Sequence, residues 1–420
     1  MHSSQNINQL AGHLFRHEAG RMAAVLARLL GSDRLQVAED IVQDTLVKAM
    51  ETWRFNGVPE NPSAWLYAVA KNKALDFIRS RQRHEKINSE IAKAVHSDWA
   101  LPASVNQLFL QHEIEDSLLR MIFATCHPSI PEESQIALTL KILCGLSVKE
   151  IASAFLTNEE AIQKRITRAK EKLREEKINL EVPAPRHLPD RLDAVLKVIY
   201  LLFNEGYHPS QSAEEIHEDL CEEAMRLANL LTQNPVTSQP RVLALLALMC
   251  LQASRFDSRR SAEGLITLEQ QDRSRWNRKL MEQGFTFLEL ASVGNDLSEY
   301  HVEAAIASVH MKAPSFEQTN WKQLVSLYDL LQRLKPGPVV ELNRAIALGY
   351  GQSYQEGIDA LESINGLDSN HFYYAAIGNF YLQMGKPRQA ADAYQKALAT
   401  AQSKVDRDFL EKKIQSTSVS

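Results

Sequence analysis

Apolar residues recur at helical spacing along almost the whole chain, and residues that break helices are rare. The 420 residues include only 16 glycines and 15 prolines. Apolar side chains return every three or four positions, which is typical of helices, rather than at every second position, which a half-buried strand requires. The sequence therefore predicts an all-α protein.

Clusters of proline and glycine divide this helical chain into segments. They fall at 56–62, around 101–102, at 127–131 and at 182–189. The last cluster is the best linker candidate, because three prolines within eight residues exclude a continuous helix. With about 150 residues per domain, a chain of this length holds two to four domains.

These breaks predict the following organisation. Two small helical domains are joined by a polar, flexible connection, and a proline-rich linker leads to a larger helical domain. Their expected bounds, in chain order, are 10–86, 87–112, 113–177, 178–190 and 191–420.

The net charge of −5 is unevenly distributed. Residues 1–177 carry 23 basic against 22 acidic side chains, whereas residues 178–420 carry 24 against 30. The acidity therefore belongs to the C-terminal part, and this asymmetry suggests that the two parts have different tasks.

The cysteines and the apolar runs indicate a protein of the reducing cytosol. The four cysteines lack the paired short spacing of zinc sites, so we expect buried, reduced thiols and no bound metal. The first twelve residues lack the apolar stretch of a secretory signal. The longest apolar run, Val242–Leu251, has ten residues, about half of what a bilayer requires, and is expected to be a buried helix.

The C-terminal tail contains one good copy and one poor copy of a repeat. Within Tyr374–Ala397 the small and aromatic residues follow tetratricopeptide spacing, and Val339–Leu361 is a weaker antecedent. That spacing encodes a helical hairpin that stacks on its neighbours. An ordinary helical hairpin remains the alternative.

Two N-terminal segments combine helical periodicity with clustered charge. In Val37–Trp53 an apolar face includes Ala38, Met50 and Trp53, and the opposite face is acidic. Pro62–Arg83 begins with a helix-start signal and ends in a basic stretch. The basic side chains of this segment can neutralise phosphates, and its aromatic residues can stack on unpaired bases. Taken alone, either segment is equally consistent with a solvated amphipathic helix.

The segment Gly145–Arg174 follows the pattern of a DNA-binding helix-turn-helix. Ser147 and Glu150 are spaced as a capping box, and Asn158 is placed to cap the second helix. Outside the apolar seam of that second helix, residues 161–174 contain six basic residues and one acidic residue. A recognition helix needs basic groups for phosphates and polar groups for base edges. Leu156 stands where such turns usually have glycine.

Together the three segments resemble the extracytoplasmic-function (ECF) sigma factors of bacterial RNA polymerase. The region-two helix that docks on the polymerase is resembled by AEDIVQDTLVKAMETW. The helix that reads the −10 element is resembled by NPSAWLYAVAKNKALDFIRSRQR. The region-four helix-turn-helix that reads the −35 element is resembled by EIASAFLTNEEAIQKRITRAKEKLR. The matches span roughly residues 10–177. PDRLDAVLKVIYLLFNEGY and the repeat-like tail resemble the subgroup with a large C-terminal extension, in which a turn without glycine is usual.

The resemblance implies three sets of contact residues and two partners, core RNA polymerase and promoter DNA. The set that faces core polymerase is Asp40, Gln43 and Asp44. The set at the −10 element is Asn56, Asn61, Trp65, Asn72, Arg79 and Arg83. The set at the −35 element is Gln163, Lys164, Arg165, Thr167, Arg168 and Lys170, of which Arg165 and Lys170 are expected at phosphates.

Two other functions remain open at the level of sequence. A helix-turn-helix regulator with a helical sensor domain would use residues 145–174 but would give the region-two segment no purpose. In a helical scaffold the basic stripes would be merely solvated surface. We expect neither catalysis nor a cofactor, because no phosphate loop, metal-ligand spacing or nucleophile–base motif occurs. The extension is expected to pack against the N-terminal domains and to control how they engage polymerase, replacing or supplementing a separate anti-sigma protein, and the family resemblance leaves open whether it activates or inhibits.

Overall fold

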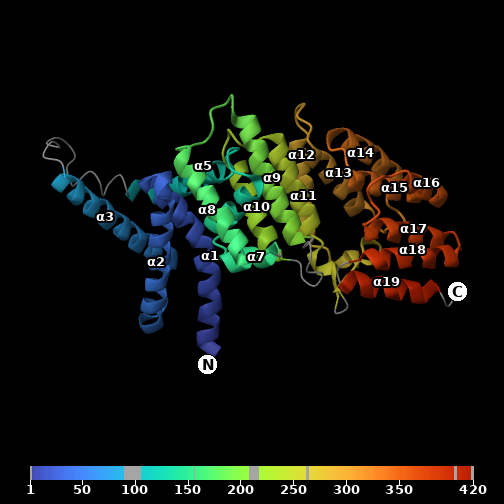
Figure 1. Ribbon diagram of the computed structural model, residues 1–420, viewed down its shortest axis with the longest axis horizontal. Helices are drawn as coiled ribbons and strands as arrows, with labels where there is room; N and C mark the ends of the chain where they lie inside the picture. Colours follow the sequence, from blue (N-terminus) through green and yellow to red (C-terminus); the bar gives the residue numbers. More distant parts are fainter. Residues whose placement is uncertain are drawn as a thin grey trace. The chain divides into compact units, whose positions relative to one another are not determined.

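The computed structural model describes residues 2–88, 106–155, 157–207, 217–261, 264–401 and 404–417 (Figure 1). Within these ranges the elements are helices, apart from one antiparallel ladder of two short strands, β1 (Arg260–Ser261) and β2 (Gly264–Leu265). The predicted all-α fold is therefore confirmed. The chain divides into two compact units, Met1–Val198 and Ile199–Ser420.

The first unit contains the three segments that the sequence singled out. Their helices begin and end within a few residues of the predicted positions. The unit comprises α1 (His2–Leu30), the 3₁₀ turn η1 (Ser32–Arg34), α2 (Leu35–Asn56), α3 (Pro62–Asn88), α5 (Gln111–Thr125), α6 (Glu132–Ile142), α7 (Val148–Ala154), α8 (Glu159–Glu175) and the first half of α9 (Leu188–Tyr207).

Helix α1 is the centre of this unit. It contacts α2 and α3, which follow it in the chain, and also α5 and α6, which lie beyond the polar connection. For this reason its six consecutive residues Met22–Ala27 are all buried, with exposed fractions of 4% or less. A helix that is apolar on every side requires packing partners all round. The two predicted N-terminal domains thus lie in one unit, and their exact bounds remain a prediction.

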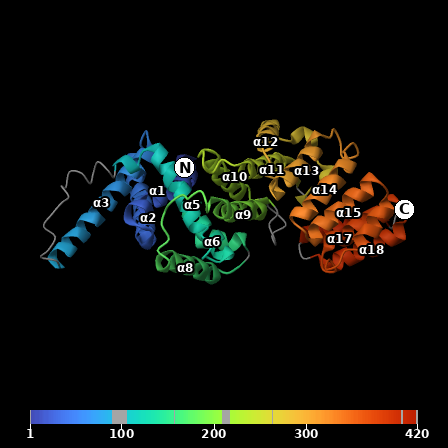
Figure 2. The same cartoon turned by 90° about the horizontal axis from the view of Figure 1, so that it is seen from above.

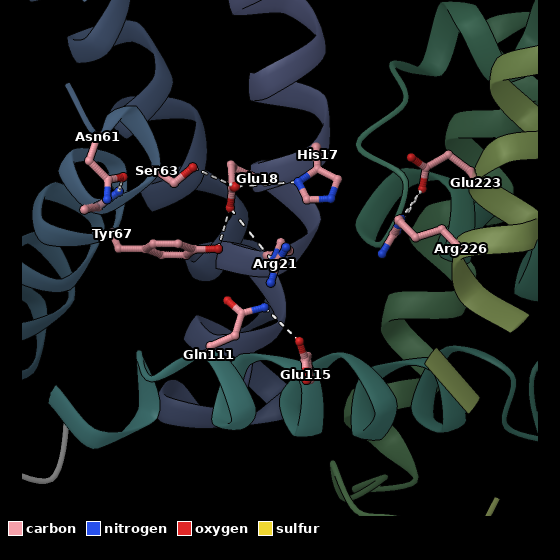
Figure 3. Close-up of polar contacts among 11 residues, drawn as sticks. His17, Glu18, Arg21, Asn61, Ser63, Tyr67, Gln111, Glu115, Glu223 and Arg226 are labelled. Atoms are coloured by element: carbon pink, nitrogen blue, oxygen red, sulfur yellow. Dashed lines mark hydrogen bonds and ion pairs between the residues drawn. The ribbon is translucent and has the colours of Figure 1, made fainter. Parts of the chain in front are cut away.

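A buried carboxylate joins α1 to α3 (Figure 3). Glu18 accepts hydrogen bonds from the Ser63 hydroxyl, at 2.9 Å, and from the Tyr67 hydroxyl, and it lies near His17 and Arg21. Burial alone would raise its pKa, but the hydrogen bonds from His17, Tyr67 and Ser63 and the charge of Arg21 lower the pKa of Glu18 to about 2. Glu18 is therefore ionised at neutral pH and fixes the start of α3.

The Pro-rich segment before α9 is free of helix, as the sequence predicts, but it is anchored at both ends. Ile178 and Leu188 are buried, and the first half of α9 packs in the first unit. There the Lys197 ammonium pairs with Glu132 of α6. The division between the units falls within α9, eight residues past the predicted end of the linker at residue 190.

The second unit is a succession of helices in which each packs on the next (Figures 1 and 2). After the second half of α9 come α10 (Glu218–Thr232), α11 (Pro240–Ala253), the 3₁₀ turns η2 (Phe256–Ser258), η3 (Leu268–Gln270) and η4 (Arg273–Arg275), α12 (Arg278–Ala291), α13 (Glu299–Lys312), α14 (Trp321–Leu334), α15 (Pro338–Gly351), α16 (Tyr354–Glu362), α17 (His371–Gln383), α18 (Pro387–Thr400) and α19 (Lys404–Thr417).

Both predicted repeats form helical hairpins, α15–α16 and α17–α18. Small residues lie where the helices touch. A Cβ atom at Gly378 would lie 2.8 Å from the Tyr394 ring, and one at Gly349 would lie 2.3 Å from Phe380 of the next hairpin. These glycines let large aromatic rings fill the space between hairpins, which is how tetratricopeptide-like repeats stack.

The apolar run and the four cysteines are buried, as expected. Val242–Leu251 lies in α11 and is almost entirely buried. All four cysteines are free and buried, and burial raises the pKa of Cys126 to about 11 and that of Cys250 to about 12. No helix in the described part of the chain is long and apolar enough to span a membrane.

We predict that Glu18→Gln destabilises the packing of α1 on α3 at neutral pH. The lowered pKa means that the contribution of Glu18 is fully present above about pH 4.5 and is lost as the pH falls toward 2. The shift corresponds to about 3 kcal/mol. Pulse hydrogen exchange after equilibration in urea, with labelling at one fixed pH, reports the stability of α1 and α3. The difference between parent and variant should shrink between pH 4.5 and pH 2, and a difference that does not change with pH would contradict this assignment.

Candidate nucleic-acid interface

Helices α7 and α8 form the predicted helix-turn-helix, and both predicted caps are present. The Ser147 hydroxyl accepts from the Glu150 N–H at 3.1 Å, and the Glu150 carboxylate accepts from the Ser147 N–H at 2.7 Å. These hydrogen bonds lower the pKa of Glu150 even though burial alone would raise it. At the start of α8 the Asn158 amide oxygen accepts from the Ala161 N–H at 2.7 Å. The caps fix where both helices begin.

The inward face of α8 is the apolar seam that the sequence predicts. Its four members are all buried: Ile162, Ile166, Ala169 and Leu173. In α7, Ile151 and Ala152 are also buried, whereas Leu156 lies outside the described residues. Because the seam faces α6 and α7, the orientation of α8 about its own axis is set, and the opposite side chains must face solvent.

The outward face of α8 carries the side chains expected at the −35 element. Gln163, Lys164, Thr167 and Arg168 are all exposed on neighbouring turns of the helix. Among them, Lys164 forms an exposed ion pair with Glu160 at 2.7 Å. Arg and Gln side chains in this arrangement can donate to and accept from base edges in a major groove.

Two basic residues at the sides of α8 are held by carboxylates instead. The Arg165 guanidinium lies 2.6 Å from Glu133 of α6. The Lys170 ammonium pairs with Glu39 of α2 and donates to the Gln36 amide oxygen at 2.9 Å. Both residues were expected at DNA phosphates. In the structure Arg165 pairs with a largely exposed carboxylate, whereas Lys170 pairs with a buried one.

The three acidic and amide residues expected to face polymerase are exposed on α2. Asp40 accepts from the Gln36 amide at 3.0 Å, Asp44 pairs with Lys73 of α3 at 2.9 Å, and Gln43 lies between them. They therefore lie together on a solvent-facing surface.

The apolar face assigned to α2 from the sequence is wrong at Met50. Met50 is 61% exposed, and Val47 beside it is 55% exposed. They continue the surface of Asp40 and Asp44, and Phe55, 83% exposed, lies at the end of the helix. Val47 stands at helical spacing from Asp40 and Asp44, a signal that sequence analysis overlooked. The reverse error occurs at Glu39, which is buried against α8 rather than solvated.

Two of the residues expected at the −10 element lie at the end of α2 and in the loop that leads to α3. Asn56 is exposed at the end of α2. The Asn61 side chain accepts from the Ala64 N–H at 3.0 Å and so helps to begin α3 (Figure 3). Trp65 is half-buried and packs edge-on against Trp53, with 5.5 Å between ring centroids. One part of its ring is therefore structural, and the remainder faces solvent.

Farther along α3, Asn72 and Arg79 are exposed as predicted. The Arg79 guanidinium lies 3.8 Å from Asp76, one helical turn away. Arg83 lies in α3, but its side chain is outside the described residues. Asn72 and Arg79 thus form an exposed polar stripe, separate from the outward face of α8.

Among the described residues, no group of three His, Cys, Asp or Glu side chains is placed to hold a metal ion. In the second unit, the buried Arg259 guanidinium lies 3.8 Å from the centre of the Tyr207 ring at the end of α9. Burial lowers the pKa of Arg259.

Comparison with known families matches three parts of the chain. Residues 14–84 match sigma-70 region 2, and residues 120–173 match sigma-70 region 4. Residues 191–292 match a family of unknown function, DUF6596. The first two matches cover the helices that carry the exposed surfaces described above.

Three similar proteins show how far the similarity extends. An uncharacterized protein of Rhizobium meliloti (strain 1021) is 35% identical over 385 residues, or 91% of this chain and 90% of that protein. RNA polymerase sigma-H factor of Pseudomonas aeruginosa is 33% identical, over 32% of this chain and 70% of that protein. ECF RNA polymerase sigma factor SigW of Bacillus subtilis is 26% identical, over 36% of this chain and 79% of that protein. Among solved structures, yeast Tom70 aligns with a TM-score of only 0.37 at 11% identity, over 94% of this chain and 83% of that chain.

Proposed function

Because the chain belongs to the ECF RNA polymerase sigma factors, in the subgroup with a large helical C-terminal extension, we propose that it binds core RNA polymerase and directs it to promoters. One structural observation carries the proposal. A capped helix-turn-helix presents Gln163, Thr167 and Arg168 to solvent on a helix whose rotation is fixed by its buried seam. We propose that these side chains and Lys164 read the −35 element.

The docking surface for polymerase is proposed on α2. Asp40, Gln43 and Asp44 offer acidic and amide groups to a basic helical partner, and the exposed Val47 and Met50 beside them add apolar area. Interfaces of this kind combine an apolar centre with a charged rim. A folded α2 with this surface free to solvent supports the proposal.

The −10 surface is proposed on α3 and the loop before it. Asn56, Asn61 and Trp65 lie around the loop, and Asn72, Arg79 and Arg83 follow along the helix. A melted base held in the loop would gain stacking on the exposed part of Trp65, which offsets the cost of unpairing. Glu18 stabilises the start of α3, and thus this surface, by accepting hydrogen bonds from Ser63 and Tyr67.

The extension is proposed to regulate how the sigma regions engage polymerase. Its stacked hairpins offer the extended surfaces that repeat proteins use for protein contacts, and the excess of acidic residues in 178–420 suits a basic partner surface. The sign of the effect, activating or inhibiting, stays open. A cytoplasmic location follows from the proposed partner, and a separate anti-sigma protein remains a further option.

Replacing Asp40 and Asp44 together by Ala should weaken binding to core polymerase. Each charged contact is worth about 1–3 kcal/mol, and both residues are exposed, so helicity should be unchanged. A competition assay with labelled parent protein measures the loss. Glu175→Ala with Glu176→Ala is the matched control, because it removes two exposed acids elsewhere in the first unit. Equal competition by the docking variant and the control would refute the proposed docking surface.

Gln163→Ala or Arg168→Ala should change the preference among −35 sequences by about 1–3 kcal/mol at one or two base pairs. Arg165→Ala is the matched comparison on the same helix. It should weaken binding to every sequence about equally and reduce the salt dependence, because Arg165 is proposed to contact a phosphate. Binding to a panel of duplexes at several salt concentrations distinguishes the two patterns. A uniform loss from all three variants would mean that the outward face is assigned wrongly.

Removal of the extension should change core binding, and the change should depend on salt. The truncation is best placed after Val198, where the first unit ends. A cut near residue 180 would remove the first half of α9, including Arg191, which donates to the Phe123 carbonyl oxygen at 2.5 Å. Core binding by residues 1–198 and by the full chain is compared at two salt concentrations. Equal binding by the two proteins at both salt concentrations would show that the extension does not affect core binding.

A further inference from the structure

A group of basic side chains interrupts the acidic composition of the second unit. Residues 178–420 hold 24 basic against 30 acidic side chains, yet residues 273–279, from η4 to the start of α12, hold four basic side chains and no acidic one. Three of the four are exposed to solvent, namely Arg275, Arg278 and Lys279. These three side chains form a surface that we term the α12 basic patch.

The backbone beneath the patch is firmly held. Trp276, within the same segment, is buried in an apolar cluster with residues of α11, α12 and α13. The Arg273 guanidinium donates to the carbonyl oxygens of His310, at 2.6 Å, and Ala313, at 2.8 Å, where α13 ends. The Asn277 side chain caps the first turn of α12. Because these contacts fix the segment, binding through the patch would order little additional backbone.

The charges of the patch stand where the helix itself disfavours them. Arg278 and Lys279 are the first two residues of α12, and the first turn contains no acidic residue. The positive end of a helix dipole favours acidic side chains there and disfavours basic ones. In the described part of the chain neither Arg278 nor Lys279 is paired with a carboxylate. Asp272, just before the segment, accepts hydrogen bonds from Ser274 instead. The fold therefore leaves both positive charges available to a negatively charged partner.

A further exposed cation extends the patch along α12. Lys312, at the end of α13, is exposed, and its ammonium lies 5.4 Å from the centre of the Phe285 ring. Phe285 follows Arg278 by two helical turns, or about 10 Å, on the same face of α12. Duplex DNA carries one negative charge per about 1.7 Å of its axis, so a row of cations of this length spans several phosphates.

The surroundings of the patch distinguish between a nucleic acid and a protein as its partner. The exposed large apolar side chains that follow the patch in the chain, Leu290, Val293 and Leu297, lie at or beyond the opposite end of α12. Protein interfaces have apolar and aromatic side chains at their centre. Contacts to the phosphates of DNA use charge, and a guanidinium matches two phosphate oxygens at once. A basic patch without exposed large apolar side chains therefore fits a phosphate backbone best.

We propose that the α12 basic patch binds the phosphate backbone of double-stranded DNA, so that the extension adds a sequence-independent contact to the promoter complex. The proposal rests on the proposed sigma function for its setting, because the sigma regions bring duplex DNA to the chain that carries the patch and so raise its effective concentration. The contact itself needs no polymerase and is a property of the free chain.

The test measures binding of the full chain to a fluorescent DNA duplex of random sequence, without polymerase, by anisotropy at several salt concentrations. The patch variant carries Arg275→Gln, Arg278→Gln and Lys279→Gln. A charge-conserving variant carries Arg275→Lys and Arg278→Lys. Circular dichroism and thermal melting report the fold of each variant.

The matched control carries Arg333→Gln, Arg388→Gln and Lys396→Gln. It removes the same number of arginines and lysines from exposed positions that are spread over α14 and α18. The control and the patch variant therefore have the same net charge and differ in where the charges are removed.

At low salt we expect the patch variant to bind the duplex about 10- to 100-fold more weakly than the parent, and the slope of log affinity against log salt to be less steep by about 2–3. The control should lose at most about threefold, because its charges lie away from the patch. The charge-conserving variant should keep the slope of the parent. The patch variant should melt at the same or a slightly higher temperature, since its charges are unfavourable at a helix start.

Three results would overturn the proposal. The first is an equal loss of affinity in the patch variant and the control, which would mean that net charge alone decides. The second is a parent chain that does not bind the duplex at the lowest salt. The third is a patch variant that binds the duplex as the parent does but competes less well for core polymerase, which would mean that the partner is a protein. If the patch variant loses helicity, Lys279→Gln alone carries the test, with an expected change in slope of about 1.

Failure of this proposal is distinguishable from failure of the proposed sigma function. A chain that does not support transcription with core polymerase refutes the sigma function, whereas duplex binding by the free chain still decides the role of the patch.

Discussion

The burial of α1 on all sides is the constraint on which the first unit depends. Six consecutive residues, Met22–Ala27, are shielded from water, and no single neighbouring helix can cover every face of another. Helices α2 and α3 supply one set of contacts, and α5 and α6 supply the other. A segment before the polar connection and a segment after it are thereby brought into one core. The close approach at Gly20 is a consequence, since only a residue without a side chain lets the Leu143 backbone so near.

The exposed chemistry of the sigma regions follows from these buried contacts. The ionised Glu18 fixes Ser63 and Tyr67 and thus the start of α3, which carries the proposed −10 surface. The apolar seam of α8 turns Gln163, Thr167 and Arg168 outward. The same packing places Lys170 beside Glu39. One arrangement thus exposes the side chains proposed to read bases and pairs Lys170, which was expected at a phosphate, with a buried carboxylate.

Local signals made much of this fold predictable from sequence. Capping residues such as Ser147 and Asn158 hydrogen-bond within three residues, so their spacing alone locates the helix ends. Tertiary contacts were not predictable in this way. Met50 fits an apolar helical face yet is exposed, and Glu39 fits a solvated face yet is buried, because residues far away in the chain decide which side is covered. The close approach of Gly20 to the Leu143 backbone was missed for the same reason, since a glycine in a helix indicates a close approach without naming its partner.

The central claim is that this chain replaces the sigma subunit rather than acting as a separate helix-turn-helix regulator. The most direct measurement is run-off transcription with purified core RNA polymerase, which lacks any sigma subunit, on the DNA upstream of the chain's own gene. The account predicts a discrete transcript that requires the chain, and specific promoter binding that requires core polymerase. Specific DNA binding by the chain alone, with transcription only when another sigma factor is supplied, would contradict it.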